Sequence, residues 1–344
     1  MKKTFASDNY SGVHPEIMKA LISANEGHAS SYGADDHTQS AIAAFRAMFG
    51  EETEVFFVYN GTGANVIGLT GMLQSFNSII CSELAHINVD ESTAPETFTG
   101  CKVIPVETKN GKILPHEIEK KIIRIGDQHH PQPRVISISQ TTEYGTVYTP
   151  AEIKELADLA HAHKMYLHMD GSRISNAAVS LKLKFPDFTK DAGVDVLSFG
   201  GTKNGLMFGE SVLVFDPQLA INLPYVRKQS MQLHSKMRFI GAQFVALLSN
   251  DLWKRNAAHS NRMASRLAEG LQTIPGVSLT QEVQANAVFA QVPPQLIPEM
   301  QEFLFFYVWN EKTMEVRLMC SFDTTESEVD GFVEKFRELA RNGS

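Results

Sequence analysis

Short apolar runs and longer stretches with helical spacing alternate from about residue 14 to residue 215. Apolar runs bounded by turn residues favour buried strands, whereas apolar residues three or four positions apart favour amphipathic helices. Strands are predicted at 55–59, 78–81, 103–106, 135–139, 165–169 and 194–199, and helices at 14–24, 38–49, 61–73, 115–125, 150–163 and 173–181. This alternation predicts an α/β fold with a mostly parallel central sheet flanked by helices.

The pattern changes after about residue 217. A long helical stretch over 217–274, broken near residue 250, precedes two further strand candidates at 287–292 and 315–320. We therefore predict two domains: a large domain over residues 1–240, which includes the N-terminal segment, and a small C-terminal α+β domain over 241–344. No flexible linker separates them, so we expect them to pack tightly.

Composition narrows the class of protein. The chain has 344 residues, of which 43% are hydrophobic and 20% are charged, which is enough to build a large core. A net charge of −8 without a basic block argues against a nucleic-acid partner. No apolar run approaches the roughly 20 residues of a membrane span, and the polar start argues against export. Together with three widely spaced cysteines in apolar contexts, these features predict a cytoplasmic protein with reduced thiols.

Two residues carry the strongest chemical signal. Lys203 follows a predicted strand in the glycine-rich run Phe199-Gly200-Gly201-Thr202-Lys203, and Asp170 ends the strand before it. One strand–helix–strand unit separates them, so both fall at the same edge of a parallel sheet. Pyridoxal phosphate needs this pair, a lysine for the Schiff base and an acid for the pyridinium nitrogen. The pair therefore predicts a pyridoxal phosphate site.

Other residues have two interpretations each. Gly61 and Thr62 lie between a predicted strand and helix, where backbone N–H groups could hold a phosphate or simply form a tight turn. Thr202 could add a hydroxyl to that phosphate. His86 could stack on the cofactor ring, although a histidine after a strand is more often an ordinary polar residue.

Two arginines and several histidines are further candidates for a binding or metal site. Arg173 could lie on the surface, and Arg317 stands in an apolar strand, but both suit a substrate carboxylate because of their planar guanidinium groups. We predict no metal site, because no acid or cysteine completes a ligand set around the paired histidines, which are His129, His130, His161 and His163.

Taken in order, five motifs resemble those of the low-specificity L-threonine aldolases. They are Tyr32-Gly33-Ala34-Asp35-Asp36, Phe57-Val58-Tyr59-Asn60-Gly61-Thr62, Ala85-His86, His168-Met169-Asp170-Gly171-Ser172-Arg173 and the run that ends at Lys203. The likeness begins at Phe5-Ala6-Ser7-Asp8-Asn9-Tyr10-Ser11-Gly12 and ends at Arg317-Leu318-Met319-Cys320-Ser321, so it covers nearly the whole chain. The low-specificity L-threonine aldolases are pyridoxal phosphate enzymes of the aspartate aminotransferase fold type, known as fold type I. Asp-Gly-Ser-Arg here replaces the more common Asp-Gly-Ala-Arg, and Gly-Gly-Thr-Lys replaces a Ser-Lys-Gly form.

The resemblance implies a role for each candidate. Lys203 corresponds to the Schiff-base lysine, Asp170 to the partner of the ring nitrogen, and His86 to the stacking histidine. It places Gly61, Thr62 and Thr202 at the phosphate, Arg173 beside the cofactor, and Ser7, Arg173 and Arg317 at the substrate carboxylate. His130 resembles a second histidine that some members place near the substrate hydroxyl.

The implied reaction cleaves L-threonine or L-allo-threonine, as amino-acid substrate, to glycine and an aldehyde. The base for the substrate hydroxyl stays open among His86, His130 and a bound water. A β-eliminating lyase and an aminotransferase are the alternatives within pyridoxal phosphate enzymes, and a non-catalytic sensor with this fold is the alternative outside them. Because the resembling family builds its sites at a dimer interface, a homodimer or homotetramer is expected, with Lys228 or Arg238 reaching the neighbour's cofactor.

Overall fold

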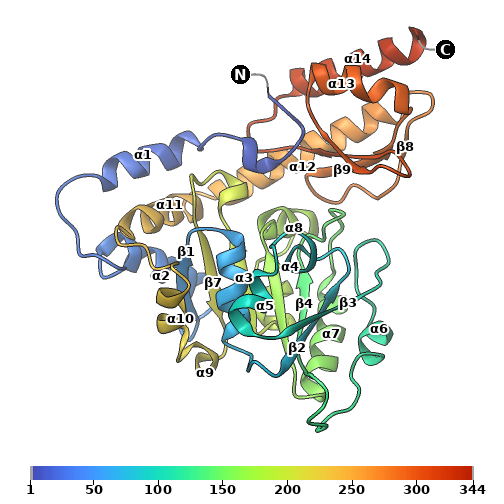
Figure 1. Cartoon of the computed structure of the whole chain (residues 1–344). Coiled ribbons are helices and arrows are strands. Elements are labelled where there is room, and N and C mark those ends of the chain that lie inside the picture. The colour runs from blue at the N-terminus through green and yellow to red at the C-terminus, as the bar shows by residue number, and fades with distance from the viewer. Residues whose placement is uncertain (1–2, 343–344) are drawn as a thin grey trace.

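A seven-stranded sheet forms the centre of the larger part of the molecule (Figure 1), in a computed structural model that describes residues 3–342. Its strand order is β1-β7-β6-β5-β4-β2-β3. β7 runs antiparallel to both neighbours and the other pairs are parallel, which confirms the mostly parallel sheet. The strands are β1 (Glu54–Val58), β2 (Asn77–Ser82), β3 (Lys102–Val106), β4 (Gln132–Ser139), β5 (Tyr166–Gly171), β6 (Val196–Gly200) and β7 (Glu210–Val214).

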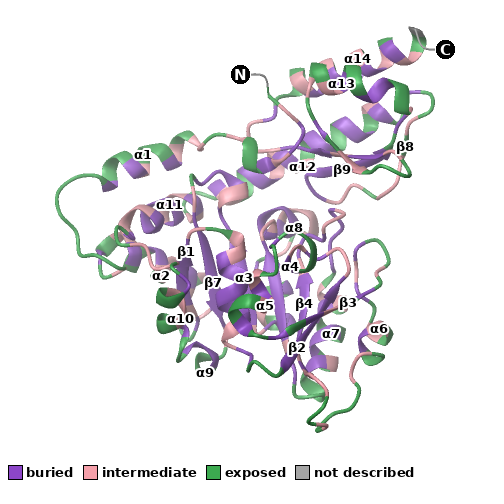
Figure 2. Ribbon diagram, viewed as in Figure 1, coloured by how far each residue is buried: buried purple, intermediate pink, exposed green. Residues whose placement is uncertain are grey.

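Helices cover both faces of this sheet, and for this reason most strand residues are buried, whereas the edge strand β3 is partly exposed (Figure 2). On β1, Phe57 packs into one face while Phe56 and Val58 pack into the other, as the twofold alternation of a strand requires. One face is covered by α1 (Pro15–Ala24), α2 (Asp36–Phe49), α6 (Pro115–Glu119), α7 (Pro150–Ala162), α8 (Ile174–Leu181) and α11 (Arg238–Leu248). The other carries α3 (Gly61–Thr70), α4 (His86–Val89), α5 (Ala94–Thr99), α9 (Pro217–Ala220) and α10 (Leu223–Gln229).

A second, four-stranded antiparallel sheet of order β10-β11-β9-β8 forms the smaller part. It consists of β8 (Ser278–Leu279), β9 (Ala287–Gln291), β10 (Tyr307–Asn310) and β11 (Glu315–Met319), packed with α12 (Leu252–Leu271), α13 (Ile297–Phe303) and α14 (Glu326–Asn342). The N-terminal segment joins this part, because Phe5 is buried in its core and bonds through its backbone to Phe305 and Met319.

The sequence missed β7, since its apolar run lies directly after the glycine-rich turn. The predicted helical stretch over 217–274 is four helices, α9 to α12. The predicted domain boundary at residue 240 falls inside α11, whose Ile240, Phe244 and Leu247 pack in the core of the large sheet. We propose that the large unit extends to the end of α11 and that residues 3–7 associate with the small one.

Two features are absent from residues 3–342, the part of the chain that the structure describes. No helix there has both the length and the apolar character needed to cross a membrane. No group of three or more histidine, cysteine or acidic side chains there is placed to hold a metal ion. All three cysteines are free thiols and are buried.

Candidate active site

A cavity of about 170 Å³ opens where β4, β5 and β6 end, between the large sheet and the small unit. Its walls include Trp309 from β10 as well as residues of the large unit. Six residues predicted from the sequence line it, namely Ser7, His86, Asp170, Arg173, Lys203 and Arg317. Parallel strands place their carboxyl ends at one edge, which is why residues so far apart in sequence meet here.

The glycine-rich run before Lys203 has a steric reason. A Cβ atom built at Gly200 would collide with the backbone of Ser172, so the ends of β5 and β6 can approach this closely only with glycine there. A short 3₁₀ turn over Thr202–Asn204 follows and ends at Gly205, whose φ of 106° is in the left-handed region. The turn places the Lys203 side chain in the same cavity as Asp170.

The surroundings of the cavity lower the pKa of both Lys203 and Asp170. Burial first, and then the Arg173 cation, lower the pKa of the Lys203 amine, although Asp8, Asp170 and Glu210 oppose this. Burial alone would raise the pKa of the Asp170 carboxyl, but Lys203, Asn65 and the Ser172 N–H outweigh it and lower that pKa. Asp170 is therefore ionised at neutral pH, and Lys203 loses its proton more readily than a surface lysine.

Asn65 on α3 links two parts of the site that the sequence reasoning treated separately. Its amide nitrogen donates to Asp170 Oδ2 at 2.9 Å and to Glu91 Oε1 at 2.8 Å. Glu91 Oε1 also lies 2.8 Å from His86 Nδ1, and this hydrogen bond raises the pKa of His86 despite its burial. Asn65 and Glu91 were not predicted, and the only sequence signal was the position of Asn65 at the end of the Gly61-Thr62-Gly63-Ala64-Asn65 run.

Arg173 is held by an acid that the sequence reasoning also missed. Asp8 accepts from Arg173 Nε at 2.7 Å and from Nη2 at 2.9 Å, and it accepts a third hydrogen bond from Asn286 Nδ2 at 3.0 Å. Only 1% of the Asp8 residue is exposed. Burial alone would raise the pKa of Asp8, but Arg173 outweighs it and lowers that pKa. Asp8 was visible in the motif that contains Ser7, but nothing in the sequence connected it with Arg173.

Arg317 keeps more of its hydrogen-bonding capacity than Arg173 does. Its Nη2 donates to the Ala6 carbonyl at 3.2 Å, while its Nε is buried without a partner. The guanidinium lies 4.9 Å from the ring centre of Trp309 and 5.8 Å from that of Tyr307. Stacking of this kind holds the group in place and leaves its edge free for an anion.

The predicted phosphate residues lie at the same sheet edge but outside the 170 Å³ cavity. Asn60 caps α3 by accepting from the Gly63 N–H at 2.8 Å, and the space around Gly61 is open. Gly61 and Thr62 thus occupy the first turn of a helix, where N–H groups favour an anion. The Thr202 hydroxyl lies 3.5 Å from the Gly209 carbonyl oxygen.

His130 is the one predicted site residue that a single chain does not bring to this edge. It precedes β4, whereas Ser139 at the other end of the same strand lines the cavity. Its Nδ1 lies 2.8 Å from the Pro131 carbonyl oxygen. An eight-residue strand therefore separates His130 from the cavity within one chain.

Residues 4–293 match the model of the family described as Beta-eliminating lyase. The chain belongs to this family. Its similarity to the low specificity L-threonine aldolase of Pseudomonas aeruginosa is 44% identity, over 98% of this chain and 96% of that one. A second relative of that name, from a Pseudomonas strain, is 43% identical over 98% of this chain and 95% of its own. The solved Leishmania major threonine aldolase superposes with a TM-score of 0.93 at 30% identity, covering 98% of this chain and all of that one.

These likenesses confirm the resemblance and the fold inferred from the motifs. Membership of the family also implies pyridoxal phosphate, so the site of this family member should suit that cofactor. Around the cavity, Glu143 Oε2 and Arg317 Nε are buried without partners, as are Asn65 Oδ1 and Glu91 Oε2 nearby. The Lys203 amine makes no hydrogen bond to any residue that the structure describes. The free amine, the ionised acid and the unsatisfied polar atoms fit the cofactor with an amino acid beside it.

Proposed function

We propose that this protein cleaves L-threonine and L-allo-threonine to glycine and acetaldehyde with pyridoxal phosphate as cofactor. The observation that carries the proposal is the meeting, in one cavity, of the Lys203 amine, the Asp170 carboxylate and two arginines. The high identity to two low specificity L-threonine aldolases over almost the whole chain supports it. When bound, the cofactor supplies an electron sink that allows a bond at the amino acid's Cα to break.

Each residue then has a task that follows from its contacts. Lys203 binds the cofactor through its amine, and ionised Asp170 keeps a proton on the ring nitrogen. Glu91 and Asn65 hold His86 and Asp170 in fixed relation, which suits His86 for packing on the ring face. The first turn of α3 with Gly61 and Thr62, together with Thr202, would hold the phosphate.

Arg173, Arg317 and Ser7 are the residues that we expect to bind the substrate carboxylate. Asp8 already occupies Nε and Nη2 of Arg173, so Arg173 can offer only its remaining nitrogen. Arg317, with its unpartnered Nε, is the stronger candidate for a two-point contact with a carboxylate. Holding that carboxylate orients the Cα–Cβ bond for cleavage.

We also propose that the active molecule contains at least two copies of this chain. Several large side chains in and around α10 are exposed to solvent in the single chain, namely Tyr225 at 73%, Met231 at 76% and Tyr32 at 50% exposure. Lys228 lies 5.0 Å from the Tyr32 ring centre and belongs to the same face. A second copy covering this face would bury these groups. Light scattering should then give a mass that is a multiple of 38.1 kDa, and a mass of one chain would contradict the proposal.

The aldolase proposal is tested by an absorbance spectrum of the purified protein before and after L-threonine is added, with acetaldehyde measured in the same tube. We expect a cofactor band that shifts on addition, together with released acetaldehyde and glycine. A band without acetaldehyde, but with pyruvate and ammonia, would instead show a β-eliminating lyase. A protein that shows no band after incubation with pyridoxal phosphate would refute the cofactor site. A cytoplasmic location stays a prediction.

A further inference from the structure

Glu143 is an acid in the wall of the cavity that neither the sequence reasoning nor the roles above use. It follows β4, in the loop that also brings Thr141 and Thr142 to the cavity. Its Oε1 accepts from the Ser139 hydroxyl at 2.6 Å and from the His86 backbone N–H at 3.2 Å. Two donors on one oxygen therefore fix the carboxyl group beside the start of α4.

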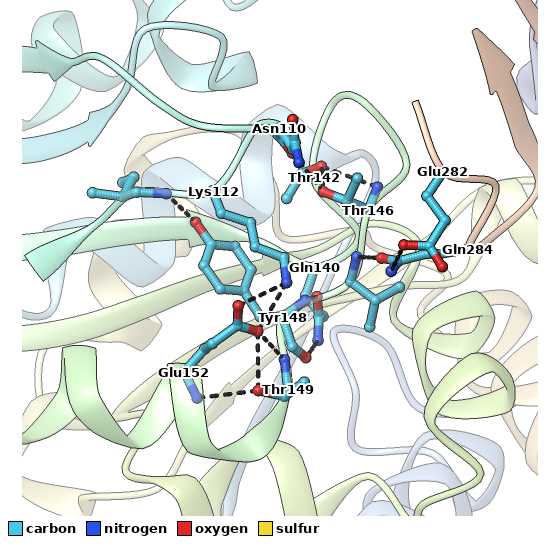
Figure 3. A network of polar contacts seen from close by, with 12 residues as sticks. Asn110, Lys112, Gln140, Thr142, Thr146, Tyr148, Thr149, Glu152, Glu282 and Gln284 are labelled. Atoms are coloured by element: carbon cyan, nitrogen blue, oxygen red, sulfur yellow. Dashed lines mark hydrogen bonds and ion pairs between the residues drawn. The ribbon is translucent and has the colours of Figure 1, made fainter. Parts of the chain in front are cut away.

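The loop that carries Glu143 is held firmly by a polar network (Figure 3). The Gln140 side chain donates to the Tyr148 carbonyl at 2.9 Å and accepts from the Tyr148 N–H at 3.0 Å. The Thr142 and Thr146 hydroxyls lie 2.7 Å apart, so both sides of the loop are joined. Val147 N–H donates to Gln284 of the small unit at 2.6 Å. Glu143 thus stands at a defined place in the cavity wall, as a reacting group must.

The second oxygen of Glu143 has no hydrogen bond. Oε2 is buried and without a partner, although Glu143 as a residue is only partly buried. A buried oxygen without a donor is unfavourable, so such an atom at a cavity points to a donor supplied by a ligand. In a β-hydroxy-α-amino acid, the hydroxyl group is a donor of the required kind.

The protonation of Glu143 suits the transfer of a proton in both directions. Burial raises the pKa of this carboxyl to about 7, although the Ser139 hydrogen bond opposes the rise. The Asp170 charge on β5 adds to the rise, the backbone N–H of His86 at the start of α4 opposes it, and Arg173 before α8 is the cation whose charge interacts with Glu143. A group with a pKa near the working pH can accept a proton and return it within one turnover.

We propose that Glu143 takes the proton from the β-hydroxyl of the substrate during cleavage. This inference rests on the aldolase function proposed above. The O–H bond breaks and its proton moves to Glu143 Oε2, while the electron pair of that bond forms the C=O bond of the aldehyde. The Cα–Cβ bond breaks and leaves its electron pair with Cα. A proton from solvent then completes glycine at Cα, and Glu143 releases the hydroxyl proton to solvent and is ionised again.

The competing candidates are less well placed within one chain. His86 Nδ1 is already committed to Glu91, and His130 lies at the far end of β4. Glu143 lines the same cavity as Arg317, so both ends of an amino acid held there can be contacted at once.

The test compares Glu143→Gln with the unchanged holoenzyme in two reactions. One is cleavage of L-threonine, and the other is exchange of the glycine α-proton in D₂O, which needs the cofactor but involves no hydroxyl. We expect kcat for cleavage to fall by about 10²–10⁴-fold with a nearly unchanged KM. Glycine exchange and the cofactor spectrum should stay within a few-fold of the unchanged enzyme. Glu83→Gln is the matched control, because its Oε2 is also buried and unpartnered but lies outside the cavity.

Two further measurements separate a chemical role from a structural one. Infrared spectra of the cofactor-free protein should show less protonated carboxyl near neutral pH in Glu143→Gln than in the unchanged protein. Glu143→Asp, which keeps an acid, should recover part of the cleavage rate. Cleavage at the unchanged rate in Glu143→Gln would overturn the inference, and so would an equal loss of cleavage and glycine exchange. An unchanged enzyme that exchanges glycine but releases no aldehyde would instead refute the proposed function.

Discussion

Replacing Lys203 with alanine will lower the rate of L-threonine cleavage by at least about a thousandfold, because it removes the amine that binds the cofactor. The fold should survive, since the Lys203 amine makes no hydrogen bond to the described residues and its removal takes a buried charge out of the site. Steady-state cleavage rates measure the effect. Borohydride treatment provides a second readout, because it should fix the cofactor permanently to the unchanged protein and not to the variant.

The control for this prediction is Lys154→Ala. Lys154 lies on the exposed face of α7, where it pairs with Asp158, and its loss should leave both readouts unchanged. Retention of cleavage above about a tenth of the original rate in Lys203→Ala would show that another amine binds the cofactor. In that case the Schiff-base role would have to be reassigned.

Replacing Asp8 with asparagine should lower the free energy of unfolding by about 3–5 kcal/mol, because it leaves the Arg173 cation without its buried counter-charge. The loss should also raise KM for L-threonine, because a freed Arg173 no longer holds a fixed position in the cavity. Urea unfolding of the cofactor-free protein measures the first effect, and steady-state kinetics measures the second.

The pH dependence of this effect has a definite sign. The pKa of Asp8 is lowered in the folded protein, so its contribution is fully present above the unfolded pKa of about 3.9 and is lost as pH falls through the folded value. Between pH 6 and 8, roughly, the destabilisation by Asp8→Asn should therefore be constant. Asp330→Asn is the control, since its bidentate pair with Arg266 is solvent-exposed and should contribute little to stability. A cost for Asp8→Asn as small as that of Asp330→Asn would contradict the argument.

The sequence predicted the sheet and the central pair of the site for a physical reason. Buried parallel strands are continuous apolar runs, and their carboxyl ends share one edge, so Asp170 and Lys203 could be placed together without coordinates. β7 was not predicted because its apolar run follows the glycine-rich turn so closely, and its antiparallel direction is not visible in the sequence because buried parallel and antiparallel strands have the same apolar run. Its position in the sheet depends on pairing, which a local pattern does not contain.

The rest of the site depends on contacts between distant segments. Asn65, Glu91 and Asp8 are ordinary polar residues until their partners are known. Glu143 was hidden for the same reason, because only burial and the two hydrogen bonds on Oε1 distinguish it from other loop acids. For His130 the resemblance predicted a place near the substrate hydroxyl, but within one chain His130 lies at the end of β4 that is remote from the cavity.

The attachment of the N-terminal segment to the small unit determines when the site can be completed during synthesis. Met319 N–H bonds to the Phe5 carbonyl, and Arg317 bonds to Ala6 across a separation of 311 residues. During synthesis, the segment around residues 5 and 6 can therefore reach its folded position only after residues 317–319 have been made. The large sheet can form earlier from contacts between neighbouring segments, whereas the small unit requires residues 5 and 6 to meet residues 317–319 across most of the chain. A nascent chain without β11 would hold Asp170 and Lys203 in position and still lack Arg317.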